Sequence, residues 1–260
     1  MSPDEPSSTR PALVKVVDII DTIDAILQPQ RLKDSAPNGL QVPGSEAVSR
    51  IVTGVSASRA LIDRAVELDA GLVLCHHGLF WDFHPTGLSP VVAERLRRLF
   101  RHDIALAAYH LPLDAHPTIG NNALLAERLG AAGHEAFGDV GRRAQFPGDG
   151  IPIEELAARV ETVTGRVPLL QGRGPELVQT IAIVSGAAAS MLPEAIAQGL
   201  DAFLTGEPRE HVMADAEEAG IHFLAAGHYA TETFGIRRIG ELLEERFGLE
   251  HHFVDLPNAV

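Results

Sequence analysis

Two adjacent histidines, His76 and His77, end an apolar run in residues 74–84, which read LCHHGLFWDFH. Neighbouring side chains on a regular strand point to opposite faces, but two imidazoles can diverge at a strand end where Gly78 lets the chain turn. Each ring can then serve a different divalent ion. The doublet therefore suggests one ligand for each member of a metal pair.

Two further histidines follow Ala-Ala-x runs and stand four residues before a carboxylate: His110 before Asp114, and His228 before Glu232. Imidazole and carboxylate together suit Zn, Mn, Fe or Ni ions. A metal pair also needs a bridging carboxylate, and Glu232 is the better candidate because its spacing from His228 at a helix start puts both on one side. Pro112 excludes a regular helix between His110 and Asp114, so we expect a loop there.

The elements that must position these groups recur along the chain. Residues 49–58 predict a strand, 58–70 a helix and 71–77 a buried strand of parallel-sheet type, and residues 183–207 repeat this order. Each half then carries a third strand that ends in a His-x3-carboxylate pair. Reactive groups in such sheets collect beyond the carboxyl ends of strands. There the repeat places His76 and His77, His110 and Asp114, Thr205 to Glu207, and His228 and Glu232.

We therefore expect an α/β fold of two similar lobes, with mixed sheets flanked by helices. The predicted divisions are a disordered tail at residues 1–10, an N-terminal lobe at 11–140 and a C-terminal lobe at 151–260. The break falls in DVGRRAQFPGDGIP, residues 139–152, where glycine, proline and charge replace periodicity. Metal ligands should come from both lobes.

Composition excludes several classes of protein. A net charge of -14 disfavours direct binding of nucleic acid. The single cysteine, Cys75, fits a reducing cytoplasm, and its apolar neighbours disfavour a nucleophilic thiol. The polar, proline-rich first residues do not resemble a signal peptide, and no apolar run is long enough to span a membrane. A cytoplasmic location follows as the expectation. The chain also lacks a phosphate-loop motif and a serine-hydrolase elbow.

Five ordered motifs resemble the NGG-one-interacting-factor-three-like family, also called dinuclear-metal-centre proteins or GTP cyclohydrolase type 2 homologues. They are NGLQV (38–42), LCHHGLFW (74–81), AYHLPLDAHPTIGNN (108–122), FLTGE (203–207) and GHYATETFG (227–235). The likeness covers nearly all of the chain after about residue 12. Many members have proline after the histidine pair, where this sequence has Gly78, as bacterial members with HHGLFW-like runs do.

The resemblance implies a set of site residues. Two divalent ions would be bound by five ligands: His76, His77, Asp114, His228 and Glu232. His110 would act as a proton shuttle or outer support, and Glu207 would contact substrate or water. The resemblance also implies that the metals lie in a cleft between the lobes. It further implies a toroidal homohexamer whose sites face an internal cavity.

The reaction class that follows is metal-assisted hydrolysis of a small molecule, because paired cations activate water and stabilise a developing oxyanion. The rings of the segment after the doublet either wall the pocket and stack on a heterocycle or form a packed hinge; they are Phe80, Trp81, Phe83 and His84. A cyclohydrolase-like reaction on GTP or a related nucleotide is the specific hypothesis. The alternative is a non-catalytic protein that stores or delivers metal or serves as a scaffold.

Overall fold

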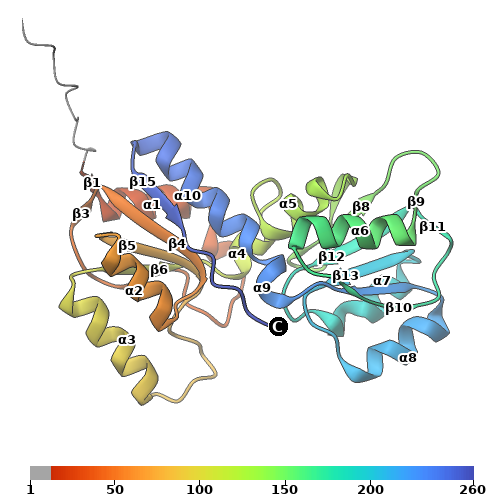
Figure 1. Cartoon of the computed structure of the whole chain (residues 1–260), viewed down its shortest axis with the longest axis horizontal. Coiled ribbons are helices and arrows are strands. Elements are labelled where there is room, and N and C mark those ends of the chain that lie inside the picture. Colours follow the sequence, from red (N-terminus) through yellow and green to blue (C-terminus); the bar gives the residue numbers. More distant parts are fainter. Residues whose placement is uncertain (1–12) are drawn as a thin grey trace, which may run out of the picture.

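The computed structural model describes residues 13–260 and has two α/β lobes side by side (Figure 1). The expected disordered tail, residues 1–10, lies outside the described residues. The first lobe is built around a five-stranded sheet in the order β15-β4-β5-β6-β2, and the second around a six-stranded sheet in the order β10-β14-β13-β12-β8-β7. Both sheets are mixed and flanked by helices, as the sequence predicted. Among the described residues, no helix combines the length and apolarity needed to cross a membrane.

The first repeat consists of β1 (Val14–Lys15), α1 (Val16–Leu27), η1 (Pro29–Arg31), β2 (Gly39–Val42), β3 (Ala47–Val48), β4 (Arg50–Ser56), α2 (Arg59–Glu67), β5 (Leu72–His77), α3 (Pro90–Arg101), β6 (Ala105–Ala108), α4 (Leu111–Ala115), α5 (Asn121–Arg128) and β7 (Ala132–Phe137). β8 (Gly141–Gln145) then leads into the second repeat. This contains β9 (Ile151–Pro152), α6 (Ile153–Thr164), β10 (Leu169–Gly172), β11 (Leu177–Val178), β12 (Thr180–Val184), η2 (Ala189–Met191), α7 (Leu192–Ala197), β13 (Ala202–Thr205), α8 (Glu210–Ala219), β14 (His222–Ala225), α9 (His228–Thr231), α10 (Thr233–Phe247) and β15 (Glu250–Phe253).

The two lobes share one plan. Each begins with a two-residue strand, a twelve-residue helix and a four-residue strand, followed by a second two-residue strand that pairs antiparallel with the first. Three parallel strands follow, β4-β5-β6 or β12-β13-β14, and the four-residue strand pairs antiparallel with the last of them. This repeat confirms the prediction of two similar lobes.

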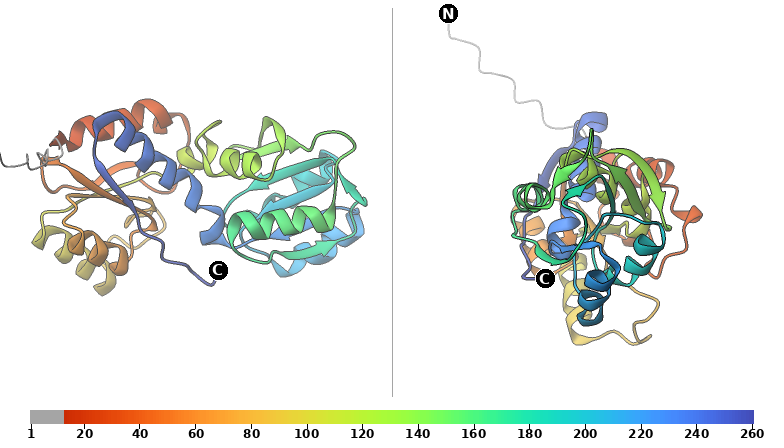
Figure 2. Two further views of the ribbon diagram at one scale, coloured as in Figure 1. Left: turned by 45° about the horizontal axis from the view of Figure 1, so that its top comes forward. Right: turned by 90° about the vertical axis from the view of Figure 1, so that its right-hand side faces the viewer.

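The chain crosses between the lobes after each third parallel strand. Helix α5 packs on the second sheet through Leu125 and Leu129, and β7 and β8 extend that sheet beside β12. Helix α10 packs on the first sheet through Ile236 and Ile239, and β15 pairs with β4. Figure 2 shows α10 lying alongside α1 in the first lobe. The sheets are therefore not divided at residues 140 and 151, because each repeat gives its last helix and strand to the other lobe.

Local chemistry explains the segments that carry the polar groups. Strand β5 is buried along nearly its whole length, so it reads as a continuous apolar run that ends at the histidine doublet. Burial raises the pKa of the Cys75 thiol, as its apolar neighbours predicted. The expected loop between His110 and Asp114 is in fact the five-residue helix α4. Pro112 lies in its first turn, where a missing N–H costs no hydrogen bond.

Candidate metal centre

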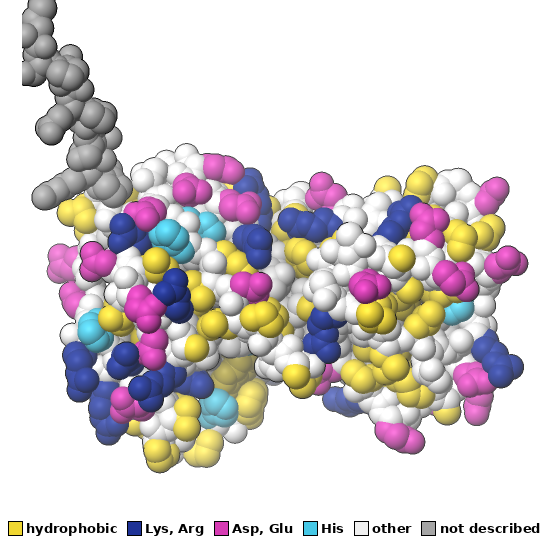
Figure 3. Space-filling model, viewed as in Figure 1, with side chains coloured by type: hydrophobic (Ala, Val, Ile, Leu, Met, Phe, Trp, Pro, Cys, Tyr) yellow, Lys and Arg dark blue, Asp and Glu magenta, His cyan; other side chains and the backbone are white. Residues whose placement is uncertain are grey.

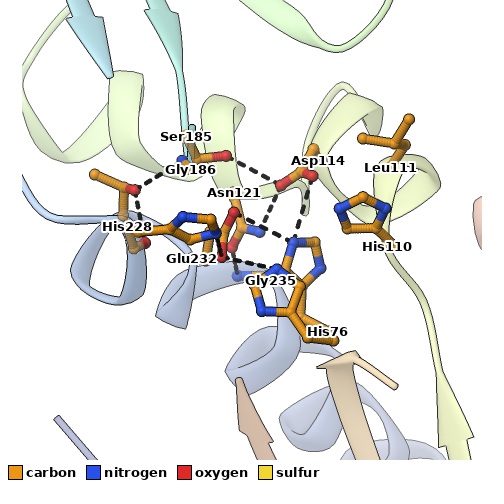
Figure 4. A network of polar contacts seen from close by, with 12 residues as sticks. His76, His110, Leu111, Asp114, Asn121, Ser185, Gly186, His228, Glu232 and Gly235 are labelled. Atoms are coloured by element: carbon orange, nitrogen blue, oxygen red, sulfur yellow. Dashed lines mark hydrogen bonds and ion pairs between the residues drawn. The ribbon is translucent and has the colours of Figure 1, made fainter. Parts of the chain in front are cut away.

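The predicted ligands meet where the chain crosses between the lobes. His76 and His77 end β5, and Asp114 lies on α4. His228 is the first residue of α9, and Glu232 directly follows that helix (Figure 4). The side chains of His76, Asp114 and Glu232 are almost fully buried. The first two elements belong to one repeat and α9 to the other, so the site takes its side chains from both repeats.

The carboxylate of Glu232 lies between the imidazoles. Its Oε2 is 3.2 Å from Nε2 of His77 and 3.1 Å from Nε2 of His228. Its Oε1 is 3.6 Å from Nε2 of His76, which in turn is 3.4 Å from Oδ2 of Asp114. The two oxygens of Glu232 thus face two different groups of ligands.

Three groups of side chains have the spacing needed to hold a metal ion: His76 with Asp114 and Glu232, His77 with His228 and Glu232, and His76 with His77 and His110. Glu232 takes part in two of these groups. Within the described residues, Nε2 of His76 and Oε2 of Glu232 are buried without a hydrogen-bond partner. Such atoms are costly to bury unless something binds them, so the donor set fits a divalent cation.

The outer nitrogen of each histidine ring is held by a hydrogen bond. Nδ1 of His76 lies 2.9 Å from the carbonyl oxygen of Tyr109, and Nδ1 of His77 lies 3.2 Å from Oγ of Ser56. Nδ1 of His228 lies 2.5 Å from Oε1 of Glu207. Partners of this kind fix the ring orientation and leave Nε2 facing the site. Glu207 therefore holds the outer nitrogen of His228. Its predicted contact with substrate or water stays a prediction.

Asp114 is oriented by residues from both repeats of the chain. Its Oδ1 accepts hydrogen bonds from Nδ2 of Asn121 at 2.8 Å and from Oγ of Ser185 at 3.0 Å. The backbone N–H of Gly235 donates to Oδ1 of Asn121 at 2.7 Å, which ties α5 to α10. With Oδ1 occupied, Oδ2 is the oxygen that faces His76 (Figure 4).

His110 has a partner that the sequence did not reveal. Oδ1 of Asp34 lies 2.8 Å from Nδ1 of His110, while Oδ2 accepts from the N–H of Leu111 at 2.9 Å and from Nδ2 of Asn38 at 3.0 Å. Burial opposes ionisation of Asp34, but these hydrogen bonds and the nearby imidazole lower its pKa to about 2. Asp34 lies just before the NGLQV motif, which begins at Asn38, and belongs to none of the five ordered motifs.

Burial and the neighbouring charges shift the pKa values of all five predicted ligands. Burial alone would lower the pKa of His76, but Asp114 and Glu232 raise it to about 9. His228 behaves in the same way, because Glu232 and Glu207 overcome its burial and raise its pKa to about 9. Burial lowers the pKa of His77 to about 3. Glu232 is kept ionised by the imidazoles despite its burial, whereas burial raises the pKa of Asp114.

A pocket of about 510 Å³ opens onto these groups. His77, His110, Asp114, His228 and Glu232 line it on one side, and its apolar wall consists of Trp81, Leu111, Val140, Val184, Ala187, Ala188 and Met191. The Trp81 ring centroid lies 5.0 Å from that of His110 and 5.4 Å from that of Phe83. Trp81 therefore walls the pocket, while Phe83 remains 67% exposed.

Gly186 leaves room for the carboxylate of Glu232. Its φ of +69° is a conformation that favours glycine, and a Cβ atom here would lie 2.3 Å from Oε1 of Glu232. The backbone carbonyl of Gly186 accepts hydrogen bonds from the N–H groups of Gly206 and Glu207. The loop after β12 therefore needs a residue without a side chain at this position.

Comparisons with known proteins give one consistent family. The family model described as Duf34/NIF3 (NGG1p interacting factor 3) matches residues 14–259. A protein of Escherichia coli (strain K12) named GTP cyclohydrolase 1 type 2 homolog is 44% identical over 252 residues, which cover 94% of this chain and 99% of that protein. A protein of the same name from Pseudomonas aeruginosa is 43% identical over 244 residues, covering 92% of this chain and 96% of the relative.

Solved structures show the same fold. The structure titled "protein ybgI, unknown function" superposes with a TM-score of 0.92 at 43% identity and covers 95% of this chain and all of that one. TTHA1606 from Thermus thermophilus has a TM-score of 0.89 at 36% identity, again over 95% of this chain and 100% of the other.

Proposed function

This chain belongs to the Duf34/NIF3 family, and on that premise we propose that it is a metal-dependent hydrolase with a dinuclear centre. The observation that carries the proposal is the position of Glu232, whose two carboxylate oxygens face two different sets of candidate ligands. In this proposal His76 and Asp114 serve one ion, His77 and His228 serve the other, and Glu232 is shared. Zn, Mn, Fe and Ni all suit these ligands.

Two such ions, when bound, supply the Lewis acidity that activates water and stabilises negative charge on an oxygen. The chain's own residues supply orientation and proton transfer. His110 lines the pocket and holds its Nδ1 proton against Asp34, so its Nε2 is left to accept a proton in the pocket. Glu207 and Ser56 fix the rings of His228 and His77, which keeps their Nε2 atoms directed at the centre.

The substrate is proposed as a small molecule with a planar heterocycle that packs against Trp81 in the apolar wall of the pocket. The names of the relatives make ring opening of GTP, or of a related nucleotide, the specific reaction to test first. A cytoplasmic location, which the single cysteine favours, and a toroidal homohexamer, which the family resemblance implies, belong to the same proposal.

A second function has one observation in its favour. His110 shares a metal-sized group with His76 and His77, so it could complete the coordination of an ion and leave no open position. The protein would then store or deliver metal, or act as a scaffold, without turnover.

The two functions are separated by loading the protein with Mn, Zn, Fe or Ni. Each form is incubated with nucleotides, phosphoesters and peptides, and with GTP while formate release is followed. The hydrolase reading predicts turnover that Glu232→Gln abolishes and that Glu244→Gln, at an exposed position of α10, leaves unchanged. If no metal form exceeds Glu232→Gln with any substrate, the hydrolase reading fails and metal storage or a scaffold role remains.

A further inference from the structure

A second large pocket lies at the junction of the lobes, away from the candidate ligands. It has a volume of about 540 Å³ and is lined by the end of α6, by α9 and the start of α10, and by residues 255–258. Three arginines line it: Arg128, Arg166 and Arg237. We call it the arginine pocket. Figure 3 shows Lys and Arg side chains around the junction of the lobes on the face in view.

The positive charge in this pocket is not matched by acidic groups. Within residues 13–260, none of the three arginines forms an ion pair with Asp or Glu; these pairs lie elsewhere. Arg166 donates to the carbonyl oxygens of Asn258 and Ala259, which are neutral. Asp255, the one acidic residue of the lining, accepts a hydrogen bond from the hydroxyl of Tyr229 at 2.6 Å. Three cationic side chains thus line the pocket with one acidic side chain, and the α-carboxylate of Val260 accepts a hydrogen bond from the N–H of Tyr229 beside them.

Two of the guanidinium groups are held over aromatic rings. Cζ of Arg128 lies 4.8 Å from the centroid of Phe234, and Cζ of Arg237 lies 4.1 Å from that of Phe253. A guanidinium that packs on a ring face keeps the N–H groups at its edge available for an acceptor. Arg166 packs against Gly227, where a Cβ atom would lie 2.7 Å from its Nη1. These contacts position the side chains before any ligand arrives.

We propose that the arginine pocket binds the phosphate group of a small anion, either free phosphate or a phosphate ester. Planar guanidinium forks match the oxygens of phosphate, and three of them line this one pocket. The site is distinct from the metal pocket but shares helix α9 with it. His228 faces the metal pocket, while Tyr229 and Ala230 line the arginine pocket. The proposal does not depend on the metal centre or on its chemistry.

Equilibrium dialysis of radiolabelled orthophosphate tests the proposal on the full chain. The protein is first treated with a chelator so that ions in the metal centre cannot retain phosphate. We expect Arg128→Gln and Arg237→Gln each to raise the dissociation constant by about tenfold or more, the loss expected for a hydrogen bond to a charged group. Arg237→Lys keeps the positive charge but loses the planar guanidinium group. Its dissociation constant should lie between that of the wild type and that of Arg237→Gln. Arg97→Gln is the control, because Arg97 is exposed and paired with Glu94 on α3.

A second arm identifies the source of the phosphate group. If glycerol phosphate displaces orthophosphate at lower concentration than unlabelled orthophosphate does, the ligand is an ester. If glycerol phosphate displaces the label only at a higher concentration than unlabelled orthophosphate does, the ligand is the free ion. The proposal is overturned if the wild-type chain does not retain orthophosphate. It is also overturned if the correctly folded Arg128 and Arg237 variants retain as much orthophosphate as Arg97→Gln.

Discussion

Oδ1 of Asp34 lies 2.8 Å from Nδ1 of His110. The other groups that contact the Asp34 carboxylate all donate hydrogen bonds to it: the N–H groups of Ala36 and Leu111 and the side-chain amide of Asn38. An ionised carboxylate satisfies all of them, whereas an amide must turn its own NH₂ group toward one. The arrangement fixes the proton of His110 on Nδ1 and leaves Nε2 as an acceptor in the pocket.

Asp34→Asn should therefore disturb the tautomer of His110 and destabilise the fold by about 1–3 kcal/mol, the cost of an unsatisfied buried group. Imidazole nitrogen shifts measured by NMR would report the tautomer, and urea unfolding the stability. Asp82→Asn, at an exposed position, should change neither. An unaltered His110 spectrum in Asp34→Asn would show that Asp34 does not set the tautomer.

Glu207→Gln should weaken metal binding without removing a ligand. The carboxylate holds Nδ1 of His228 at 2.5 Å and makes that ring a stronger donor at Nε2. Loss of such an outer partner lowers metal affinity by roughly 10–100-fold. Competition with a chromogenic chelator measures the affinity, and Glu210→Gln, exposed on α8, serves as the control. Equal metal affinities in the two variants would show that Glu207 does not support metal binding through His228.

Gly186→Ala offers a steric test of the bridging carboxylate. Its Cβ atom would lie 2.3 Å from Oε1 of Glu232, so we expect metal affinity to fall sharply. Gly199→Ala is a matched control: its φ of +66° gives the same backbone strain as the +69° of Gly186, and no heavy atom lies within 4 Å of its Cβ. Both variants should lose about 1–2 kcal/mol of stability because of the left-handed backbone, Gly186→Ala should lose more because of the clash with Glu232, and only Gly186→Ala should lose metal affinity. Full metal content in Gly186→Ala would contradict the position assigned to Glu232.

The metal-free chain should lose stability as the pH rises from 6.5 to above 9. The folded pKa values of His76 and His228 are both raised to about 9, from 6.5. Their contribution is present in full below pH 6.5 and disappears as the pH passes 9. Each should amount to on the order of 3 kcal/mol. Thermal unfolding of chelator-treated protein checks this, and His76→Gln should flatten the profile whereas the exposed His102→Gln should not.

Metal affinity should show the opposite trend over the same range. Ions displace protons from His76 and His228, so binding should strengthen between pH 6.5 and 9 and release protons. The release can be measured by calorimetry in buffers of different ionisation enthalpy. Binding that releases no protons at pH 7 would argue against coordination by these two rings.

Much of the site was predictable because strand ends leave a local signature. An apolar run that stops at His76 and His77 predicts a buried strand whose last residues reach an edge, and the repeat predicts the neighbouring ends. The structure brings these histidines together with Asp114, His228 and Glu232, as expected. Their role as metal ligands stays a prediction.

Other parts of the site left no periodic signal. Asp34 and Ser185 reach the site from loops distant in sequence, and a hydrogen bond between such loops has no spacing that could be recognised beforehand. The exchange of elements between lobes was hidden for a similar reason. The apolar face of α10 predicts burial against a sheet but does not say which of the two sheets it covers.

The central claim is that two divalent ions share Glu232. Anomalous scattering at the Mn, Fe, Ni and Zn edges, from crystals of protein purified without added metal, tests it most directly. The account predicts two peaks about 3.5–4 Å apart, both in contact with Glu232 and each next to one histidine of the doublet. A single peak, no peak, or two peaks that persist in Glu232→Gln would contradict it.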